Sequence, residues 1–333
     1  MKKFLYKTIK FIFPILLIVL VLIYIDPFKV YRNYEKYYQN NFIELNRETV
    51  CTRTYNKYRE LKNFNSFIFG SSRSQAFKCE EWVKYLDDKS TLFHFDGSGE
   101  GIYGVSNKIR YIDELGDTIK NALIVVDRTL LMVNKNRDGH LWISPPELSN
   151  ESNIEYYNTF LKAQVNYKFL FAYVDYSFSN KYKEYMGKLI RDSKYPEISN
   201  DTNCDIWYGY DKHIKTDSLG YYKGLIDKGV FYKRPIKKTW DSEITILEIK
   251  QLESIKAIFN KHNTNYKIVV SPVYDQIPLE EKQVELLNKI FGKENVYNFS
   301  GINELTMPIS NYYEDNHYRP IVANKILKKI YNK

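Results

Sequence analysis

The chain has few of the residues that mark repetitive or disulfide-rich proteins, because its 333 residues include only 14 Gly, 10 Pro and three Cys. The scarcity of Gly and Pro excludes a collagen-like or low-complexity architecture. The three cysteines, Cys51, Cys79 and Cys204, form no C-x-x-C pair, and their odd number leaves at least one thiol unpaired. We therefore expect no disulfide framework.

Motifs for metals and nucleotide cofactors are also missing. The five His residues show neither H-x-x-H nor H-E-x-x-H spacing, so we expect no metal site. The Gly-rich segment 96–101 reads as a plain loop or as a phosphate cradle. It lacks both the G-x-G-x-x-G pattern and a following G-K-[ST], which disfavours a nucleotide site. No cofactor is expected.

The formal net charge of +9 is concentrated near the N-terminus. Lys2, Lys3, Lys7 and Lys10 supply four of these nine charges and leave +5 for the remaining 323 residues. No dense Lys/Arg run and no nucleic-acid-binding motif follows them, so we expect no nucleic-acid partner. The basicity instead indicates a membrane topology signal.

An uncharged apolar run of 15 residues, 11–25, follows these lysines. As a helix it would span roughly 22 Å, short of a roughly 30 Å hydrocarbon core, and flanking apolar residues extend it if Lys7 and Lys10 snorkel to the headgroups. The alternative is a cleaved signal peptide, but residues 26–29 offer no small residues for cleavage. We predict an uncleaved signal anchor over residues 1–29.

The N-terminal lysines favour a cytoplasmic N-terminus and a single-pass protein whose remaining residues lie outside the cytoplasm, in the periplasm or at the cell surface. Lys29, Arg32 and Lys36 on the other flank weaken that bias.

The remaining sequence alternates between short apolar runs and amphipathic segments after a Tyr-, Asn- and Glu-rich segment, 30–61, that we predict to be a helical stalk. This alternation predicts an α/β domain over residues 62–333, with a parallel sheet covered on both faces. A segment of weak periodicity, about 134–241, is interpreted as an insertion that covers one end of the sheet. The expected strands are 64–70, 91–95, 122–127, 267–271 and 295–299, and the expected helices are 75–86, 103–115, 244–260, 278–291 and 321–331.

Polar residues follow the first three of these strands and precede the last helix. The sequence reads Gly-Ser-Ser-Arg-Ser at 70–74, Asp-Gly-Ser-Gly-Glu-Gly at 96–101 and Asp127-Arg128 after the third strand. In an open parallel sheet, ligands bind at the carboxyl ends of the strands. Taken singly, each segment has a simpler explanation, such as a turn, a helix N-cap or a structural histidine.

Together these segments supply the groups for nucleophilic acyl chemistry. A serine after the first strand needs a base, a carboxylate that orients the base, and amide donors for the oxyanion. His317 can be the base, with Glu314 or Asp315 as the orienting carboxylate. The backbone amides of Ser72 and Gly99 can be the donors, since glycine allows close approach of the backbone.

This pattern resembles the SGNH/GDSL hydrolase superfamily over residues 64–127 and 266–333. Gly70-Ser71-Ser72 corresponds to its Gly-Asp-Ser block, which puts Ser72 at the nucleophile position. Gly99 corresponds to its oxyanion glycine, and Glu314-x-x-His317 to its final Asp-x-x-His. The sequence is most similar to membrane-anchored bacterial members with Gly-Ser-Ser, including proteins associated with D-alanylation of teichoic acids and O-acetylation of surface polysaccharides.

The resemblance implies a three-layer, flavodoxin-like fold and a serine esterase or O-acyltransferase that acts on cell-envelope glycans through an acyl-serine intermediate. It also implies two kinds of partner: a cell-surface polysaccharide or acylated polymer, and a multi-spanning membrane O-acyltransferase.

Two positions depart from the family pattern. Where the third block has Asn as an oxyanion donor, this chain has Asp127-Arg128, and a carboxylate cannot donate. We expect Arg128 to replace that donor by pointing toward Ser72 and Gly99, unless Asp127 and Arg128 form a structural ion pair. Glu also stands where the triad has Asp, and the spacing favours Glu314 over Asp315. These departures leave a catalytically inactive scaffold or glycan-binding protein as the alternative.

Overall fold

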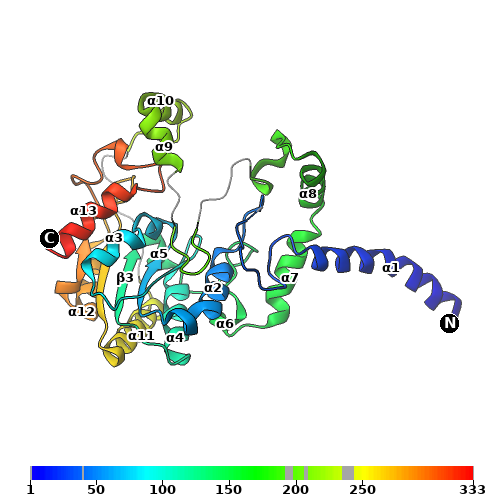
Figure 1. Ribbon diagram of the computed structural model, residues 1–333, viewed down its shortest axis with the longest axis horizontal. Helices are drawn as coiled ribbons and strands as arrows, with labels where there is room; N and C mark the ends of the chain where they lie inside the picture. The colour runs from blue at the N-terminus through cyan, green and yellow to red at the C-terminus, as the bar shows by residue number, and fades with distance from the viewer. Residues whose placement is uncertain (1, 40, 192–197, 206–208, 235–243, 333) are drawn as a thin grey trace.

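The computed structural model describes residues 2–39, 41–191, 198–205, 209–234 and 244–332 (Figure 1). Its centre is a five-stranded parallel sheet in the order β2-β1-β3-β4-β5. The strands are β1 (Ser66–Gly70), β2 (Leu92–Asp96), β3 (Asn121–Val126), β4 (Asn265–Val270) and β5 (Val296–Asn298). The predicted α/β class and parallel sheet are therefore confirmed.

Helices cover both faces of the sheet because alternate strand residues point to opposite sides. Phe67 and Phe69 of β1 are fully buried in the cluster formed with α2 (Arg47–Lys62), α4 (Ile102–Glu114), α11 (Ile246–His262) and α12 (Glu281–Phe291). Ile68 is buried in the opposite cluster, with α3 (Cys79–Trp82) and α13 (Pro320–Ile330). The strands read as continuous apolar runs because both faces are covered.

The chain between β1 and β2 differs from the single helix expected over residues 75–86. It forms the 3₁₀ turn η1 (Ser72–Ala76), the short helix α3 and the 3₁₀ turn η2 (Val83–Tyr85). The break lies at Phe77, whose backbone is extended and whose side chain is fully buried beside Trp82. Burying both aromatic rings interrupts the helix, which the amphipathic pattern alone did not reveal.

Residues 30–61 do not form the predicted helical stalk. Only α2 is helical there; it begins at the N-cap Asn46, whose side chain accepts a hydrogen bond from the Thr49 amide. Cys51 and Tyr55 of α2 are fully buried against the sheet. This helix is a core element although most of its buried residues are polar or charged: Arg47, Glu48, Thr49, Val50, Cys51, Thr52, Thr54 and Tyr55.

The N-terminal helix α1 (Lys2–Ile25) projects away from the rest of the molecule (Figure 1). Over Tyr6–Ile25 it is long and apolar enough to cross a membrane, and it is the one such helix among the residues that the structure describes. Its 20-residue span is longer than the uncharged run 11–25 because the helix begins before Lys7 and Lys10.

The expected insertion contributes most of the remaining helices. These are α6 (Pro146–Ser149), α7 (Asn153–Gln164), α8 (Tyr167–Ser179), η3 (Glu184–Leu189), α9 (Gly209–Thr216) and α10 (Ser218–Asp227). The helix α5 (Arg128–Met132) precedes the insertion, and η4 (Lys293–Asn295) and η5 (Ile309–Asn311) lie near the C-terminus. Two tyrosines of α10 hold the loop before α13: Tyr221 donates to the Tyr313 carbonyl at 2.8 Å, and Tyr222 to the Tyr312 carbonyl at 3.0 Å. The insertion therefore packs on the sheet domain next to the predicted His317.

The expectation of no disulfide is wrong for one pair, Cys79 and Cys204, which are bonded with their Cα atoms 6.0 Å apart. Spacing gave no signal because the two residues are 125 positions apart and meet only when the insertion folds back beside α3. Cys51 is the remaining free thiol and is buried.

Candidate active site

Ser72, His317 and Glu314 form a hydrogen-bonded chain at the carboxyl edge of the sheet. Ser72 opens η1 directly after β1, and its Oγ lies 2.8 Å from His317 Nε2. His317 Nδ1 is hydrogen-bonded to Glu314 Oε1, and the other carboxylate oxygen of Glu314 accepts from the Asn316 amide at 2.8 Å. The order nucleophile, imidazole and carboxylate is the arrangement of a serine-hydrolase triad.

The fold makes this meeting possible although Ser72 and His317 are 245 residues apart. Parallel strands bring their carboxyl ends to one edge, and β1 and β3 flank the point where the strand order reverses. Pro320 begins α13 and its fixed φ suits a first helical position, so the loop that carries His317 ends sharply at this edge.

The neighbouring serines have structural roles. The Ser71 side chain caps η1 by accepting from the Arg73 amide at 3.4 Å. Ser74 is fully buried and its Oγ lies 2.7 Å from the Ser71 carbonyl and 2.9 Å from His94 Nε2. Ser74 and His94 thus form a second Ser–His pair, but it is enclosed, whereas half-buried Ser72 lines a cavity.

The two candidate carboxylates behave differently. Burial would raise the pKa of Glu314, but its hydrogen bond and charge interaction with His317 hold that pKa below its ordinary value. Burial and the neighbouring Glu314 raise the pKa of Asp315. The Asp315 side chain accepts from the Asn316 side chain at 2.9 Å, and Glu314 is the carboxylate that contacts the imidazole. The structure therefore places the residue favoured by spacing behind His317.

Arg73 connects the loop after β1 to both other parts of the site. Its Nη1 donates to Asp127 Oδ2 at 2.7 Å, and its Nε donates to the Asn316 carbonyl at 3.0 Å. Asp127 also caps α5 by accepting from the amides of Thr129 at 2.8 Å and Leu130 at 3.0 Å. The sequence analysis did not assign Arg73 a role, although its position next to Ser72 was a signal.

The expectation that Arg128 points toward Ser72 and Gly99 is wrong. Arg128 forms an ion pair with Asp275 on the loop after β4, and it is not among the residues that line the cavity beside Ser72. The alternative ion pair between Asp127 and Arg128 is not observed either. Because Asp127 caps α5, Arg128 is the first helical residue, and each of the two side chains pairs with a different partner.

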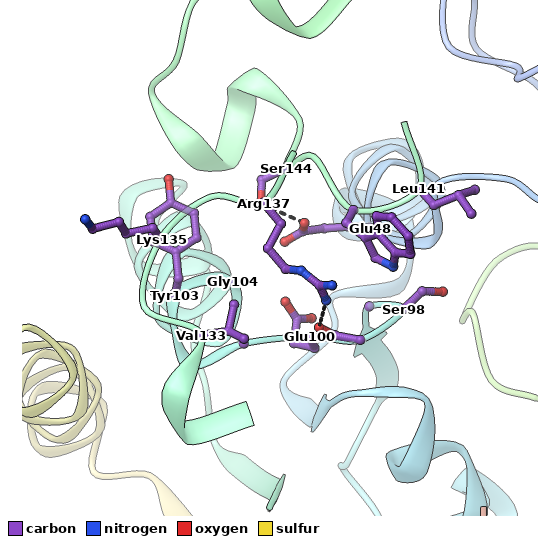
Figure 2. A pocket seen from close by; sticks show the side chains of 14 residues that line it. Glu48, Ser98, Glu100, Tyr103, Gly104, Val133, Lys135, Arg137, Leu141 and Ser144 are labelled. Carbon is purple, nitrogen blue, oxygen red and sulfur yellow. Dashed lines mark hydrogen bonds between the residues drawn. The ribbon is translucent and has the colours of Figure 1, made fainter. Parts of the chain in front are cut away.

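Gly99 lines a smaller cavity, next to that of Ser72, together with Arg137 and Trp142. Figure 2 shows this smaller cavity with Arg137 on its wall. Its φ of +59° is in the left-handed region, and its carbonyl accepts from Arg137 Nη1 at 2.8 Å. A Cβ at this position would stand 2.7 Å from Arg137 Nη1. Ser98 lines both cavities, so the chain at Gly99 passes next to the cavity of Ser72.

The cavity beside Ser72 and His317 has a volume of about 820 Å³. Aromatic and charged side chains dominate its wall, and segments of the insertion form one side of it. Three of its basic residues are paired: Arg47 with Asp96, Lys78 with Asp205 and Arg191 with Glu44. Its aromatic residues are Tyr38, Tyr210, Tyr313 and Tyr318, and Lys188 is a further basic residue.

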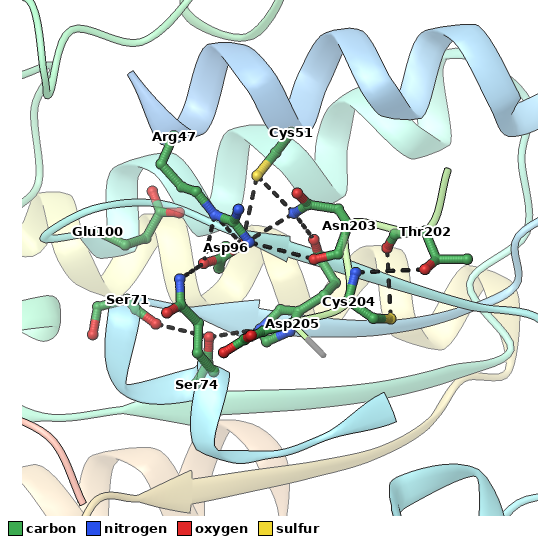
Figure 3. A network of polar contacts seen from close by, with 12 residues as sticks. Arg47, Cys51, Ser71, Ser74, Asp96, Glu100, Thr202, Asn203, Cys204 and Asp205 are labelled. Atoms are coloured by element: carbon green, nitrogen blue, oxygen red, sulfur yellow. Dashed lines mark hydrogen bonds and ion pairs between the residues drawn. The ribbon is translucent and has the colours of Figure 1, made fainter. Parts of the chain in front are cut away.

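A buried polar network holds the wall between Ser72 and the insertion (Figure 3). Asp96, at the end of β2, is fully buried and accepts from Arg47 at 2.9–3.1 Å, from Gln75 at 2.7 Å and from Asn203 at 3.2 Å. Burial would raise the pKa of Asp96, but Arg47 keeps it well below its ordinary value. Sequence reasoning missed Arg47 and Asn203, because no local pattern links them to Asp96.

The structure offers no cluster of three or more His, Cys, Asp or Glu side chains suited to a metal ion within the residues it describes. Comparison with known proteins finds no family model that matches the chain and no curated protein that is detectably similar to it in sequence.

Proposed function

We propose that the protein is a membrane-anchored, extracytoplasmic serine esterase or O-acyltransferase of the SGNH type that acts on cell-envelope glycans. The observation that carries the proposal is the chain of contacts from Ser72 Oγ to His317 Nε2, at 2.8 Å, and from His317 Nδ1 to Glu314, on the wall of an 820 Å³ cavity. A nucleophile, a base and an orienting carboxylate in this order are the side chains that acyl transfer through a serine uses.

The reaction begins when His317 Nε2 takes the proton of Ser72 and Oγ attacks the acyl carbonyl carbon of an ester. The tetrahedral oxyanion collapses, the C–O bond to the leaving alcohol breaks, and the imidazolium returns its proton to that alcohol. Glu314 stabilises the imidazolium that forms in each of the two half-reactions. In the second half-reaction His317 deprotonates water or a sugar hydroxyl, whose oxygen attacks the carbonyl carbon of acyl-Ser72. The bond from that carbon to Ser72 Oγ breaks, the imidazolium returns its proton to Oγ, and the acyl group leaves as the free acid or as the sugar ester.

Backbone amides would stabilise the oxyanion. Ser72 is the first residue of η1, where the amide has no acceptor within the helix, and Gly99 supplies the second amide of the family pattern. The third donor of the family has no counterpart at Asp127, whose carboxylate holds Arg73. We expect a slow enzyme for this reason, because one oxyanion donor is typically worth about 10²–10³ in rate.

Two features support the proposed location. The helix α1 is long and apolar enough to anchor the chain, and Cys79 and Cys204 form a disulfide. Disulfides persist mainly in oxidising environments outside the cytoplasm.

The tyrosine-rich wall suits a carbohydrate polymer. A multi-spanning membrane O-acyltransferase that supplies the acyl group is the protein partner we propose.

The second candidate is a catalytically inactive scaffold or glycan-binding protein of the same fold. The ion pair of Arg128 with Asp275 favours this candidate, since Arg128 does not take over the missing oxyanion donor at the end of β3. The intact contact between Ser72 and His317 favours the enzyme.

The test is labelling of the full chain, purified in detergent, with a fluorescent fluorophosphonate. We expect labelling of the native protein and none of Ser72→Ala. Equal labelling of the native protein and of Ser72→Ala would show that another residue is the nucleophile. Labelling of neither protein would favour the scaffold.

A further inference from the structure

The helix α8 has an exposed apolar stripe formed by Tyr167, Phe171, Val174 and Phe178. Their exposed fractions are 74%, 65%, 49% and 89%. At about 100° per residue, these four positions fall within a sector about 60° wide on the helix surface. Single exposed apolar residues are ordinary, but a contiguous stripe of large ones marks a surface that contacts something apolar.

The opposite side of α8 is already packed. Phe169 and Ala172 are buried in a cluster with α7 and with residues that follow α1, and Tyr173 and Tyr176 pack against it. Among the residues that the structure describes, the inner side of α8 packs on the folded chain, and the only aromatic ring close to the stripe is that of Tyr185, with its centroid 5.4 Å from that of Phe171. The stripe stays exposed beside this contact and can face a second apolar environment.

The inner contacts of α8 place the helix next to the end of α1. Phe28 lies three residues after α1 ends at Ile25, and its ring stacks on Phe169 with centroids 4.9 Å apart. Phe42 contacts Tyr173 and Tyr176, with centroids 5.2 Å and 4.7 Å apart. Figure 1 shows α7 and α8 at the end of the molecule from which α1 projects.

We propose that α8 lies in the headgroup region of the bilayer that α1 crosses, with its stripe inserted toward the acyl chains. The inference rests on the membrane attachment proposed above. If α1 crosses the bilayer, Phe28 is at the membrane surface, and the ring contact with Phe169 brings α8 to the same level. Tyr and Phe are well suited to this depth, where aromatic rings gather at the membrane–water boundary.

The charges around the stripe fit the same location. Residues 162–190 contain five lysines against the two acidic residues Asp175 and Glu184, a net charge of +3. Lys168, Lys181 and Lys188 are exposed. Asp175 is paired with Lys183. An apolar face flanked by lysines is typical of helices that lie on anionic membranes.

The experiment attaches a nitroxide to the full chain in vesicles of equal parts phosphatidylcholine and phosphatidylglycerol. Because Cys51 is buried and the other two cysteines are bonded, a new cysteine is the reactive one. The test variant is Phe178→Cys. The matched control is Leu219→Cys on α10, which is 88% exposed against 89% for Phe178, and Figure 1 shows α10 well away from α1. Phe13→Cys reports on α1 itself.

We expect the ratio of collisions with oxygen to collisions with a water-soluble nickel chelate to be several-fold higher at position 178 than at 219. A low ratio of oxygen to nickel collisions at position 178, as in water, together with a high ratio at position 13, as in lipid, would overturn the inference and leave the anchor intact. A water-like ratio at 13 would refute the anchor, and the inference with it.

Two further outcomes would replace the bilayer with a protein. Spin–spin broadening at position 178 would indicate a second copy of the chain. If the nitroxide at position 178 were protected from the nickel chelate in native membranes but not in lipid vesicles, the stripe would contact another protein.

Discussion

Arg73 donates to Asp127 at 2.7 Å, and this contact joins the residue after Ser72 to the end of β3. Asp127 stands where the pattern that the sequence resembles has an asparagine, and its carboxylate binds a guanidinium instead of offering an amide. The same guanidinium donates to the Asn316 carbonyl, next to His317. Under the proposed function, Arg73 is thus a positioning residue that holds the loop of Ser72 next to the loop of His317.

We predict that Arg73→Ala lowers kcat for p-nitrophenyl esters by about 10²-fold, because small displacements of reacting groups have effects of this size. KM should change little, since the substrate does not bind Arg73 directly, and Arg73→Lys should restore only part of kcat because lysine lacks the planar fork. The control is Arg128→Ala, whose side chain is similarly buried but pairs away from the site. An equal loss of kcat in both variants would contradict the assignment.

For the nucleophile, we expect Ser72→Ala to reduce turnover of p-nitrophenyl acyl esters to background while the thermal unfolding temperature stays unchanged. Ser74→Ala should keep most activity and lose stability, about 1 kcal/mol per buried hydrogen bond removed. Ser71→Ala should lower the stability of the fold, as the loss of a helix cap does. If Ser72→Ala kept full turnover and either other variant lost it, the nucleophile would be that residue.

The carboxylates give a second comparison. Glu314→Gln should lower kcat by up to about 10⁴-fold, by analogy with removal of the orienting charge in serine proteases. Asp315→Asn should have a much smaller effect, since the contact with His317 Nδ1 comes from Glu314. The measurement is kcat for both variants on one acyl ester. A larger loss in Asp315→Asn would reverse the assignment, and no loss in either would mean that His317 works without a carboxylate partner.

The sequence predicted the parts of the site that local pattern controls. Apolar runs that end in Gly or Asp predicted β1 and β2. Because the carboxyl ends of parallel strands meet at one edge of the sheet, the sequence also predicted that Ser72 and His317 lie close together. The position of Arg128 was not predictable in this way, because it depends on Asp127 starting α5 and thereby turning the next side chain toward Asp275.

The sequence did not predict the long-range contacts that have no local signal. The Cys79–Cys204 bond needs the insertion to fold back across 125 positions, and no residue near either cysteine indicates this. Likewise, the Tyr-, Asn- and Glu-rich composition of residues 30–61 predicts a stalk and not the core helix α2. Tyr55 is nevertheless fully buried, and its hydroxyl donates to Asp117 at 2.6 Å.

The disulfide should stabilise both the fold and the cavity wall. Lys78, next to Cys79, pairs with Asp205, next to Cys204, and Lys78 and Asp205 line the cavity. We predict that the double variant Cys79→Ser/Cys204→Ser loses about 2–5 kcal/mol of stability and that KM for bulky esters rises. Thermal unfolding with and without dithiothreitol measures the first effect. An unfolding temperature that dithiothreitol leaves unchanged in the native chain would contradict the prediction.

The buried His94 should make stability depend on pH. Burial lowers the pKa of His94 from 6.5 to about 4, so the folded protein keeps this side chain neutral where the unfolded chain binds a proton. Between these two values the unfolded state holds more protons, and stability therefore falls as the pH decreases from about 6.5 to about 4, by on the order of 3 kcal/mol in total.

We therefore expect the unfolding temperature of the native chain to drop more between pH 7.5 and pH 5 than that of His94→Gln, in which no imidazole titrates at this position. Glutamine can still hydrogen-bond Ser74, so the variant isolates the titration from the contact. The control is His213→Gln on α9, which makes the same substitution at an exposed histidine. Equal drops in the native chain and in His94→Gln would show that His94 does not control this dependence, and that the acid sensitivity comes from other groups.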